Sequence, residues 1–380
     1  MKGKIVMINI SPSIDKFAEP PLIPKPKRIN KKEELNLFLS FDLCDFTKFK
    51  SDENNKEIWP KVILRIWTFI NNKSKLLSRM NLWKFSGDEF IFHQKVSDLL
   101  YVADCINTAY ITMRSLEIEI KMLVEEKLNE EKNKDKNSNE DMPYVRAEKR
   151  PIRFKAGAWL ANTYPISWHE PYTTNLEKKI PSSYNYSLVN EANKIIHGDV
   201  IGTNMDEGFR MCACADKGRF LVDPKIAFMM YVSASCLENS PSNDFKKKYI
   251  DEGHDSDFLE KCISARLKLR EQKEELASEK KGLDAIEEFA NRSVFVGQKE
   301  CKGVWGERHY PIIWYSSDWG ALQETPRKKD SFVVKLLSND MPETNMDKLG
   351  KLFKEAAVDK NLVKIMSMIE VIPTNLPTSV

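Results

Sequence analysis

The chain has 380 residues, of which 42% are hydrophobic and 30% charged, with a net charge of only +3. It can bury a sizeable core, and its balanced charge argues against nucleic-acid binding driven by bulk positive charge. We find no signal peptide pattern and no run of roughly 20 apolar residues that would span a membrane. The seven cysteines are scattered without zinc-site spacing, which favours reduced thiols and a cytoplasmic protein.

The N-terminal segment is the first feature in chain order. Residues 1–33 are expected to form an extended arm, because Pro and Lys dominate residues 18–33. The apolar run at 35–43 predicts a strand that is buried on both faces of a sheet. Apolar residues recur at helical spacing across 58–80 and again across 96–128, which predicts two helices.

A hairpin and a further strand complete the first half. Residues 83–92 read as a strand with Gly87 and Asp88 at the bend of a hairpin. The charged segment at 125–143 is expected to be a solvated loop, and residues 152–162 predict another strand. The order strand, helix, strand, strand, helix, strand is the ferredoxin-like pattern, so we predict an α+β fold.

The second half continues with mixed elements. Residues 197–215 predict a turn followed by a helix from about Asp206, and residues 219–234 predict a strand and then a helix. The charged stretch around 263–290 predicts a solvated helix with ion pairs. Residues 293–316 predict a strand pair around a Lys-Gly turn.

Two aspartates carry the strongest chemical signal. Asp42 lies near the end of the first strand, and Asp88 follows Gly87, which lets the backbone bend so that the two carboxylates can face each other. Carboxylates placed in this way are typical ligands of the Mg²⁺ or Mn²⁺ ions that hold a nucleoside triphosphate. A helix beginning near Phe46 and Thr47 would add free backbone N–H groups for phosphate oxygens.

The motifs around these aspartates resemble those of class III nucleotidyl cyclases. The segment FDLCDFT at 41–47 resembles the first metal motif of that family, and KFSGD at 84–88 resembles the second. In the family, a lysine four positions before the second metal aspartate reads the base, and Lys84 stands at that position before Asp88.

Three further positions follow the same family pattern in the same order. Asp199, three positions before Gly202, matches a second base-reading residue, and Arg210, eleven positions after Asp199, matches the arginine that acts on the transition state. Lys302, in a Lys-Gly pair, matches the lysine that binds the polyphosphate. Asp206 departs from the family, which usually has asparagine there. An aspartate can accept a hydrogen bond from a ribose hydroxyl but cannot donate one.

The helix segment DEGFR at 206–210, with its aspartate at the usual asparagine position, and the segment YPIIWY at 310–315 are similar to those of bacterial pyrimidine cyclases of the Pycsar anti-phage defence systems. The resemblance implies a class III cyclase domain over 34–322, with helical insertions at about 126–150 and 238–290. The arm at 1–33 precedes this domain, and a short helical extension at 323–380 follows it.

The resemblance also implies a mechanism. A homodimer would form two shared sites, each converting a nucleoside triphosphate to a cyclic monophosphate with two Mn²⁺ or Mg²⁺ ions. The cyclic nucleotide would activate a separate downstream effector, with no nucleic-acid or membrane partner. The metals would bind Asp42, Asp88 and the backbone carbonyl of Leu43 of one chain. The other chain would supply the substrate-binding and catalytic residues Lys84, Asp199, Asp206, Arg210 and Lys302.

The choice of base stays open between two pyrimidines. Lys84 can only donate, and an ionised Asp199 can only accept. A pair arranged for the donor and acceptor of adenine suits cytosine better than uracil, which favours CTP slightly over UTP. Alternatives are an adenylate or guanylate cyclase of the same fold, or a non-catalytic nucleotide-binding domain. SGDEF at 86–90 also looks like a diguanylate cyclase hairpin, but Ser86 replaces its first glycine.

Each candidate residue also has a purely structural interpretation. Asp199 could be a turn residue, and Asp45 is better placed to cap a helix than to bind a metal. Lys84 could be an edge lysine that discourages aggregation. Arg210 could pair with Glu207 or with Asp206 on the same helix.

Overall fold

The computed structural model describes part of the chain. The described residues are 33–135, 152–163, 183–189, 195–238, 256–272, 285–286, 288–290, 292–300, 309–316 and 359–372. The predictions for residues 1–32 and 323–358 lie outside them. Within the described part, no helix is both long enough and apolar enough to span a membrane.

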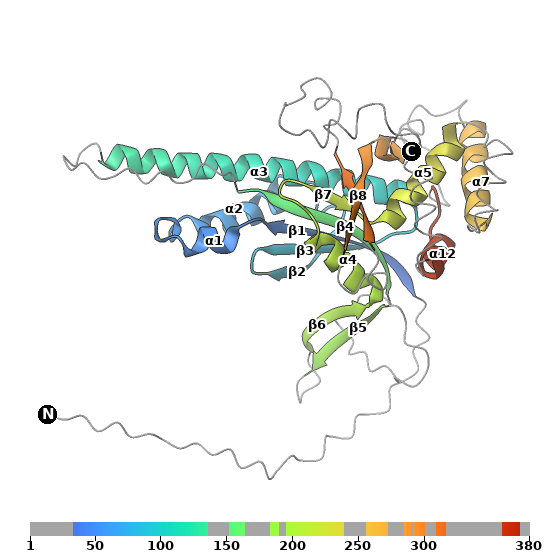
Figure 1. The fold of residues 1–380 in the computed structure, drawn as a ribbon, viewed down its shortest axis with the longest axis horizontal. Helices are drawn as coiled ribbons and strands as arrows, with labels where there is room; N and C mark the ends of the chain where they lie inside the picture. The colour runs from blue at the N-terminus through green and yellow to red at the C-terminus, as the bar shows by residue number, and fades with distance from the viewer. Residues whose placement is uncertain are drawn as a thin grey trace, which may run out of the picture.

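The first half of the chain folds in the ferredoxin-like order. Its elements are β1 Glu34–Leu43, α1 Phe46–Ser51, the 3-10 helix Glu53–Asn55, α2 Trp59–Asn72, β2 Asn81–Ser86, β3 Glu89–Lys95, α3 Leu99–Asp135 and β4 Phe154–Thr163. The four strands lie side by side as β2-β3-β1-β4, and every neighbouring pair is antiparallel (Figure 1). The α+β prediction and the predicted order are confirmed.

Strand β1 is central because its apolar side chains are buried on both faces. Leu37 and Leu39 belong to one core cluster, whereas Phe38 between them belongs to another, as expected for side chains that alternate along a strand. The strand pairs with β3 on one side and β4 on the other, so that Asp42 lies opposite both Glu89 and Lys155.

Three more strands extend the sheet beyond β4. They are β7 Phe220–Val222, β9 His309–Tyr315 and β8 Ser293–Glu300, in that spatial order. β7 runs parallel to β4, and β8 and β9 form the predicted antiparallel pair. A separate two-stranded sheet of β5 Ser183–Val189 and β6 Ile195–Gly202 was not predicted.

Helix α4, Thr203–Ala213, begins earlier than predicted. The turn expected from residue 197 onward belongs instead to β6, which pairs with β5, and the helix starts at Thr203 rather than near Asp206. The backbone φ of Gly202 is 145°, a conformation that residues with a side chain rarely adopt. This glycine allows the chain to pass from strand to helix without an intervening loop.

The helices divide between the two faces of the sheet. One face carries α2, α3, α5 Pro224–Glu238, α7 Ser256–Gln272 and α12 Asp359–Met368, whose buried side chains form one large core with the sheet. On the other face lies α4 (Figure 1), whose Met205 and Met211 form one buried cluster with Phe38 and Trp159 of the sheet.

Two expectations for charged segments are corrected within the described residues. The loop predicted at 125–143 is wrong at its start, because α3 continues to Asp135. The helix predicted around 263–290 is present as α7 as far as Gln272, but it is not solvated on all sides, since Ala265 and Arg266 are buried. That helix packs against α5 and α12, so its burial depends on contacts with distant parts of the chain.

The C-terminal helix α12 belongs to the main core. Leu362, Ile365 and Met366 are buried in the same cluster as the sheet. The Nζ of Lys261 donates to the carbonyl oxygens of Met366 at 3.2 Å and Ile369 at 3.0 Å. The described end of the predicted 323–380 extension therefore packs as part of the domain.

Candidate active site

The two candidate metal aspartates lie at adjacent turns. Asp42 is near the end of β1, and Asp88 lies in the turn between β2 and β3, where Gly87 has a φ of 72°. The backbone N–H of Leu43 donates to the carbonyl oxygen of Asp88 at 3.4 Å. The ferredoxin-like topology thus brings together two aspartates that are far apart in the sequence.

A lysine on the neighbouring strand contacts the first aspartate. The Nζ of Lys155, on β4, lies 2.9 Å from Oδ2 of Asp42, and their side chains are 28% and 29% exposed. Burial opposes the charged ammonium, but the hydrogen bond to Asp42 and its negative charge outweigh that effect and raise the pKa of Lys155. Sequence reasoning missed Lys155, because only the register of β1 against β4 identifies it.

A third carboxylate stands opposite Asp42 on β3. Glu89 accepts a hydrogen bond from the hydroxyl of Ser40 at 2.6 Å. Burial raises the pKa of Glu89, the hydrogen bond from Ser40 opposes the rise, and the charge of Asp42 adds to it. Glu89 therefore keeps a proton more readily than an exposed glutamate would, which limits the negative charge at this rim.

The donor set fits a hard divalent cation whose remaining ligands are water molecules or substrate phosphates. Within the described ranges, no group of three or more His, Cys, Asp and Glu side chains is arranged to hold a metal. Asp42 and Asp88 supply carboxylate oxygens and Leu43 a carbonyl oxygen, the ligand types that Mg²⁺ prefers. Mg²⁺ commonly takes one or two carboxylates and completes its shell with water and substrate phosphates, so the residues present fit such an ion.

The segment after β1 forms the expected helix, α1, and phosphate binding by its first backbone N–H groups stays a prediction. Phe46 is buried in the core and stacks on Phe49, so only its backbone can face a ligand, whereas Thr47 is exposed. Asp45 occupies the N-cap position of α1 but its side chain does not cap the helix. That carboxylate instead pairs with Lys217.

Lys84 lies on β2, at the edge of the seven-stranded sheet. Its Nζ is 5.6 Å from the centre of the Trp83 ring. A partly buried lysine on an edge strand is compatible with protection against edge-to-edge pairing and equally with a role in ligand binding. The base-reading role of Lys84 stays a prediction.

Helix α4 presents its two candidate residues to solvent. Asp206 and Arg210 are exposed and lie four positions apart, on the same face of the helix. Between them, Glu207 points inward and pairs with Lys225 of α5 at 2.6 Å. An ion pair between Arg210 and Glu207, the structural alternative for Arg210, is therefore disfavoured, because the carboxylate of Glu207 already contacts the buried Lys225.

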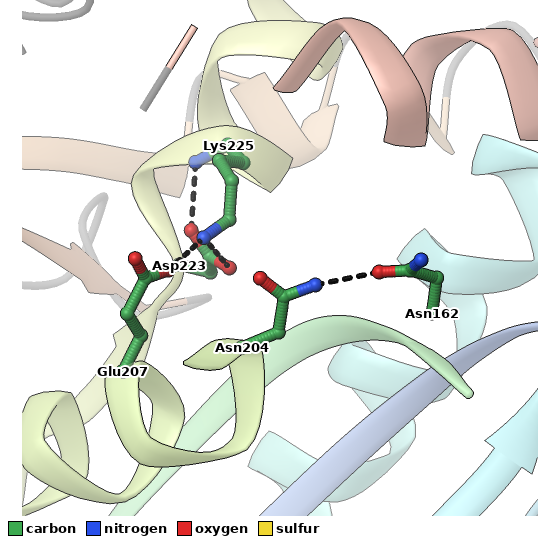
Figure 2. Close-up of polar contacts among 5 residues, drawn as sticks. All are labelled: Asn162, Asn204, Glu207, Asp223 and Lys225. Atoms are coloured by element: carbon green, nitrogen blue, oxygen red, sulfur yellow. Dashed lines mark hydrogen bonds and ion pairs between the residues drawn. The ribbon is translucent and has the colours of Figure 1, made fainter. Parts of the chain in front are cut away.

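Buried polar contacts hold α4 on the sheet. The Nζ of Lys225 also lies 3.4 Å from Asp223. One turn away, the amide of Asn204 donates to the side-chain oxygen of Asn162 on β4 at 2.7 Å. Figure 2 shows these side chains converging between α4, β4 and the start of α5. The side chains that flank Asp206 toward the core are thus anchored to two other elements.

Close packing fixes the same helix. A Cβ atom added at Gly208 would lie 2.3 Å from ring atoms of Trp159, far inside normal contact, so the helix approaches β4 through a position that only glycine can occupy. The exposed face with Asp206 and Arg210 is therefore held at a short, defined distance from the sheet.

The roles expected for the last two candidates, Asp199 and Lys302, stay predictions. Asp199 lies on β6, paired with Tyr186 of β5, and nothing is described of its side chain. Lys302 lies outside the described residues, in the connection between the paired strands β8 and β9.

The chain has partial structural similarity to known proteins. No protein-family model and no curated protein matches it. It is similar to the guanylyl cyclase Cya2 with a TM-score of 0.38 and 12% identity, over 76% of this chain and 93% of the other. For the adenylyl cyclase CyaB from P. aeruginosa the values are 0.37 and 9%, over 76% and 97%. For adenylate cyclases of Trypanosoma brucei they are 0.37 and 11%, over 74% and 88%. Similarity at this level supports no conclusion on function, which we infer from this chain's own residues.

Proposed function

We propose that this chain is a nucleotidyl cyclase of the class III type. It converts a pyrimidine nucleoside triphosphate, CTP slightly favoured over UTP, to the 3′,5′-cyclic monophosphate and pyrophosphate. The observation that carries the proposal is the meeting of Asp42 and Asp88 at one rim of a ferredoxin-like sheet. The exposed pair Asp206 and Arg210 on an anchored helix adds support.

Each residue has a role in this reaction, in which the ribose 3′-OH attacks the α-phosphorus and pyrophosphate leaves. Asp42 and Asp88, with the carbonyl of Leu43, would hold two Mg²⁺ or Mn²⁺ ions. When bound, such ions would supply a lower pKa for the 3′-OH and positive charge against the leaving phosphates. Arg210 balances charge that develops on the α-phosphate, and Lys302 holds the β- and γ-phosphates as a point charge.

The ribose and base contacts come from the remaining candidates. Asp206 accepts a hydrogen bond from a ribose hydroxyl. Lys84 donates to an acceptor on the base and Asp199 accepts from a donor, the arrangement that cytosine offers at N3 and N4. The preference for a pyrimidine over a purine rests on the resemblance of the motifs.

The active unit in this proposal is a homodimer with two shared sites. One protomer contributes Asp42 and Asp88, and its partner contributes the base, phosphate and transition-state residues. The cyclic nucleotide then acts as a second messenger in anti-phage defence by activating a separate effector protein.

The test is incubation of the purified protein with ATP, GTP, CTP and UTP separately, each with Mn²⁺, and identification of products by mass spectrometry. Cyclic CMP or cyclic UMP, absent with the Asp42→Ala variant, is the expected result. Cyclic AMP or cyclic GMP would keep the reaction and overturn the substrate. No product from any nucleotide, with binding retained, would favour a non-catalytic nucleotide-binding domain.

A further inference from the structure

The contact between Lys155 and Asp42 joins a candidate metal ligand to an internal cation. The two residues lie directly opposite each other in the antiparallel pair of β1 and β4. Their charged atoms are 2.9 Å apart, the distance of a charge-assisted hydrogen bond. Both strands are regular at this point, so the backbone register keeps the ammonium beside this carboxylate.

The surroundings make this pair more than a surface ion pair. Both side chains are about three-quarters shielded from solvent, with exposed fractions of 28% and 29%. By comparison, Lys95, the last residue of β3, is 61% exposed where it pairs with Glu34, the first residue of β1, at 2.5 Å. Charges that are partly shielded from water interact more strongly than exposed charges.

A divalent cation bound by Asp42 would share that carboxylate with an ammonium group. The two cations repel each other, and a metal bound to the oxygen atom that accepts from Lys155 would compete with the ammonium for the negative charge of that carboxylate. We propose that Lys155 is an internal counter-cation of Asp42 that lowers the affinity of the site for divalent metal. This inference rests on the proposed function, because it takes Asp42 as a metal ligand.

The test measures Mn²⁺ binding directly, without nucleotide and without turnover. The EPR signal of free aqueous Mn²⁺ is titrated against the wild-type protein and against Lys155→Met, which keeps the length of the side chain but not its charge. We expect the Kd for Mn²⁺ to fall about tenfold, equivalent to about 1.4 kcal/mol. Lys155→Gln is the second neutral variant, and circular dichroism verifies that each variant is folded.

Three controls assign the effect. Lys155→Arg keeps the positive charge and should bind Mn²⁺ within about twofold of wild type, since the repulsion is retained. Lys95→Met removes a charge from the end of β3, beside the start of β1 and away from Asp42, and should leave Mn²⁺ binding unchanged. Asp42→Ala should abolish the binding that the neutral variants at Lys155 strengthen.

The possible failures are distinct. If the wild type binds Mn²⁺ and neither Lys155→Met nor Lys155→Gln binds it more tightly, the role of Lys155 is overturned and the proposed metal site stays intact. Absence of Mn²⁺ binding in the wild type and in every variant would overturn both the metal site and this inference. Tighter binding in Lys155→Arg as well would show that charge is not the cause.

Discussion

His93 shows how burial changes the chemistry of a single side chain. It lies on β3 opposite Phe38, and its buried Nδ1 has no hydrogen-bond partner among the residues that the structure describes. Burial lowers the pKa of His93 from 6.5 to about 4, so the folded protein keeps this imidazole neutral near pH 7. A neutral histidine shielded in this way is better explained by packing than by proton transfer.

The pH dependence of stability follows from that shift. Between pH 6.5 and 4 the unfolded chain binds a proton at His93 that the folded chain does not, so stability falls as the pH is lowered through this window. We expect His93→Phe to reduce the loss of unfolding free energy between pH 7 and pH 5 by about 1–2 kcal/mol. Urea unfolding at both pH values measures it, and parallel losses in variant and wild type would contradict it.

Lys225 is a fully buried cation between two carboxylates. Its side chain is 1% exposed and lies 2.6 Å from Glu207 and 3.4 Å from Asp223 (Figure 2). Burial raises the pKa of Asp223, an effect that the charge of Lys225 opposes. The ammonium of Lys225 therefore stabilises the carboxylates of Glu207 and Asp223, which are buried away from water.

Removing that cation should be costly. Lys225→Met leaves two buried carboxylates without their partner, and we expect it to lower the unfolding free energy by about 3–5 kcal/mol. The matched control is Lys121→Met, since Lys121 forms an exposed pair with Glu125 at 3.8 Å and should change stability by less than about 1 kcal/mol. Equal effects of the two substitutions in urea unfolding would contradict the structural role of Lys225.

At the scale of elements, α12 shows that the C-terminal segment is part of the domain. Ile365 is 0% exposed in the main core, whereas Val363 on the same helix is 38% exposed. The backbone around Glu370 also bonds to residues 97 and 99 at the start of α3. These contacts tie the end of the chain to an element near its beginning.

A pair of substitutions on α12 tests this coupling. We expect Ile365→Ala to shift the main unfolding transition, with a loss of about 2–5 kcal/mol because it leaves a cavity in the core. Val363→Ala should change the same transition by no more than about 0.5 kcal/mol. If Ile365→Ala melted only a separate, minor transition, the C-terminal helix would be an independent unit.

At the scale of the whole molecule, the proposed sharing of each site between two protomers predicts the behaviour of mixed dimers. Asp42→Ala and Arg210→Ala should each abolish turnover alone, because every site in either homodimer lacks one residue. A mixed dimer carries both changes in one site and neither in the other, so it should regain about half of the wild-type activity per dimer. The measurement is cyclic nucleotide formation by a purified, doubly tagged heterodimer, and no recovery there would refute the shared-site model.

Much of the fold could be predicted from local patterns. The apolar run of β1, the helical spacing in α2 and α3 and the turn at Gly87 each depend on a few neighbouring residues. The element order then implied a ferredoxin-like sheet, and with it the adjacency of Asp42 and Asp88. The roles of Asp199, Arg210 and Lys302 came from the resemblance of motifs, and they remain predictions.

The sequence by itself therefore determined most of the elements and the pair of aspartates, because periodicity and turn chemistry are local properties. Only the tertiary structure decided that Lys155 lies against Asp42, that Glu207 pairs with Lys225 and that α12 enters the core. These contacts join residues on different helices and strands. Strand register and helix packing set them, and no local pattern records either.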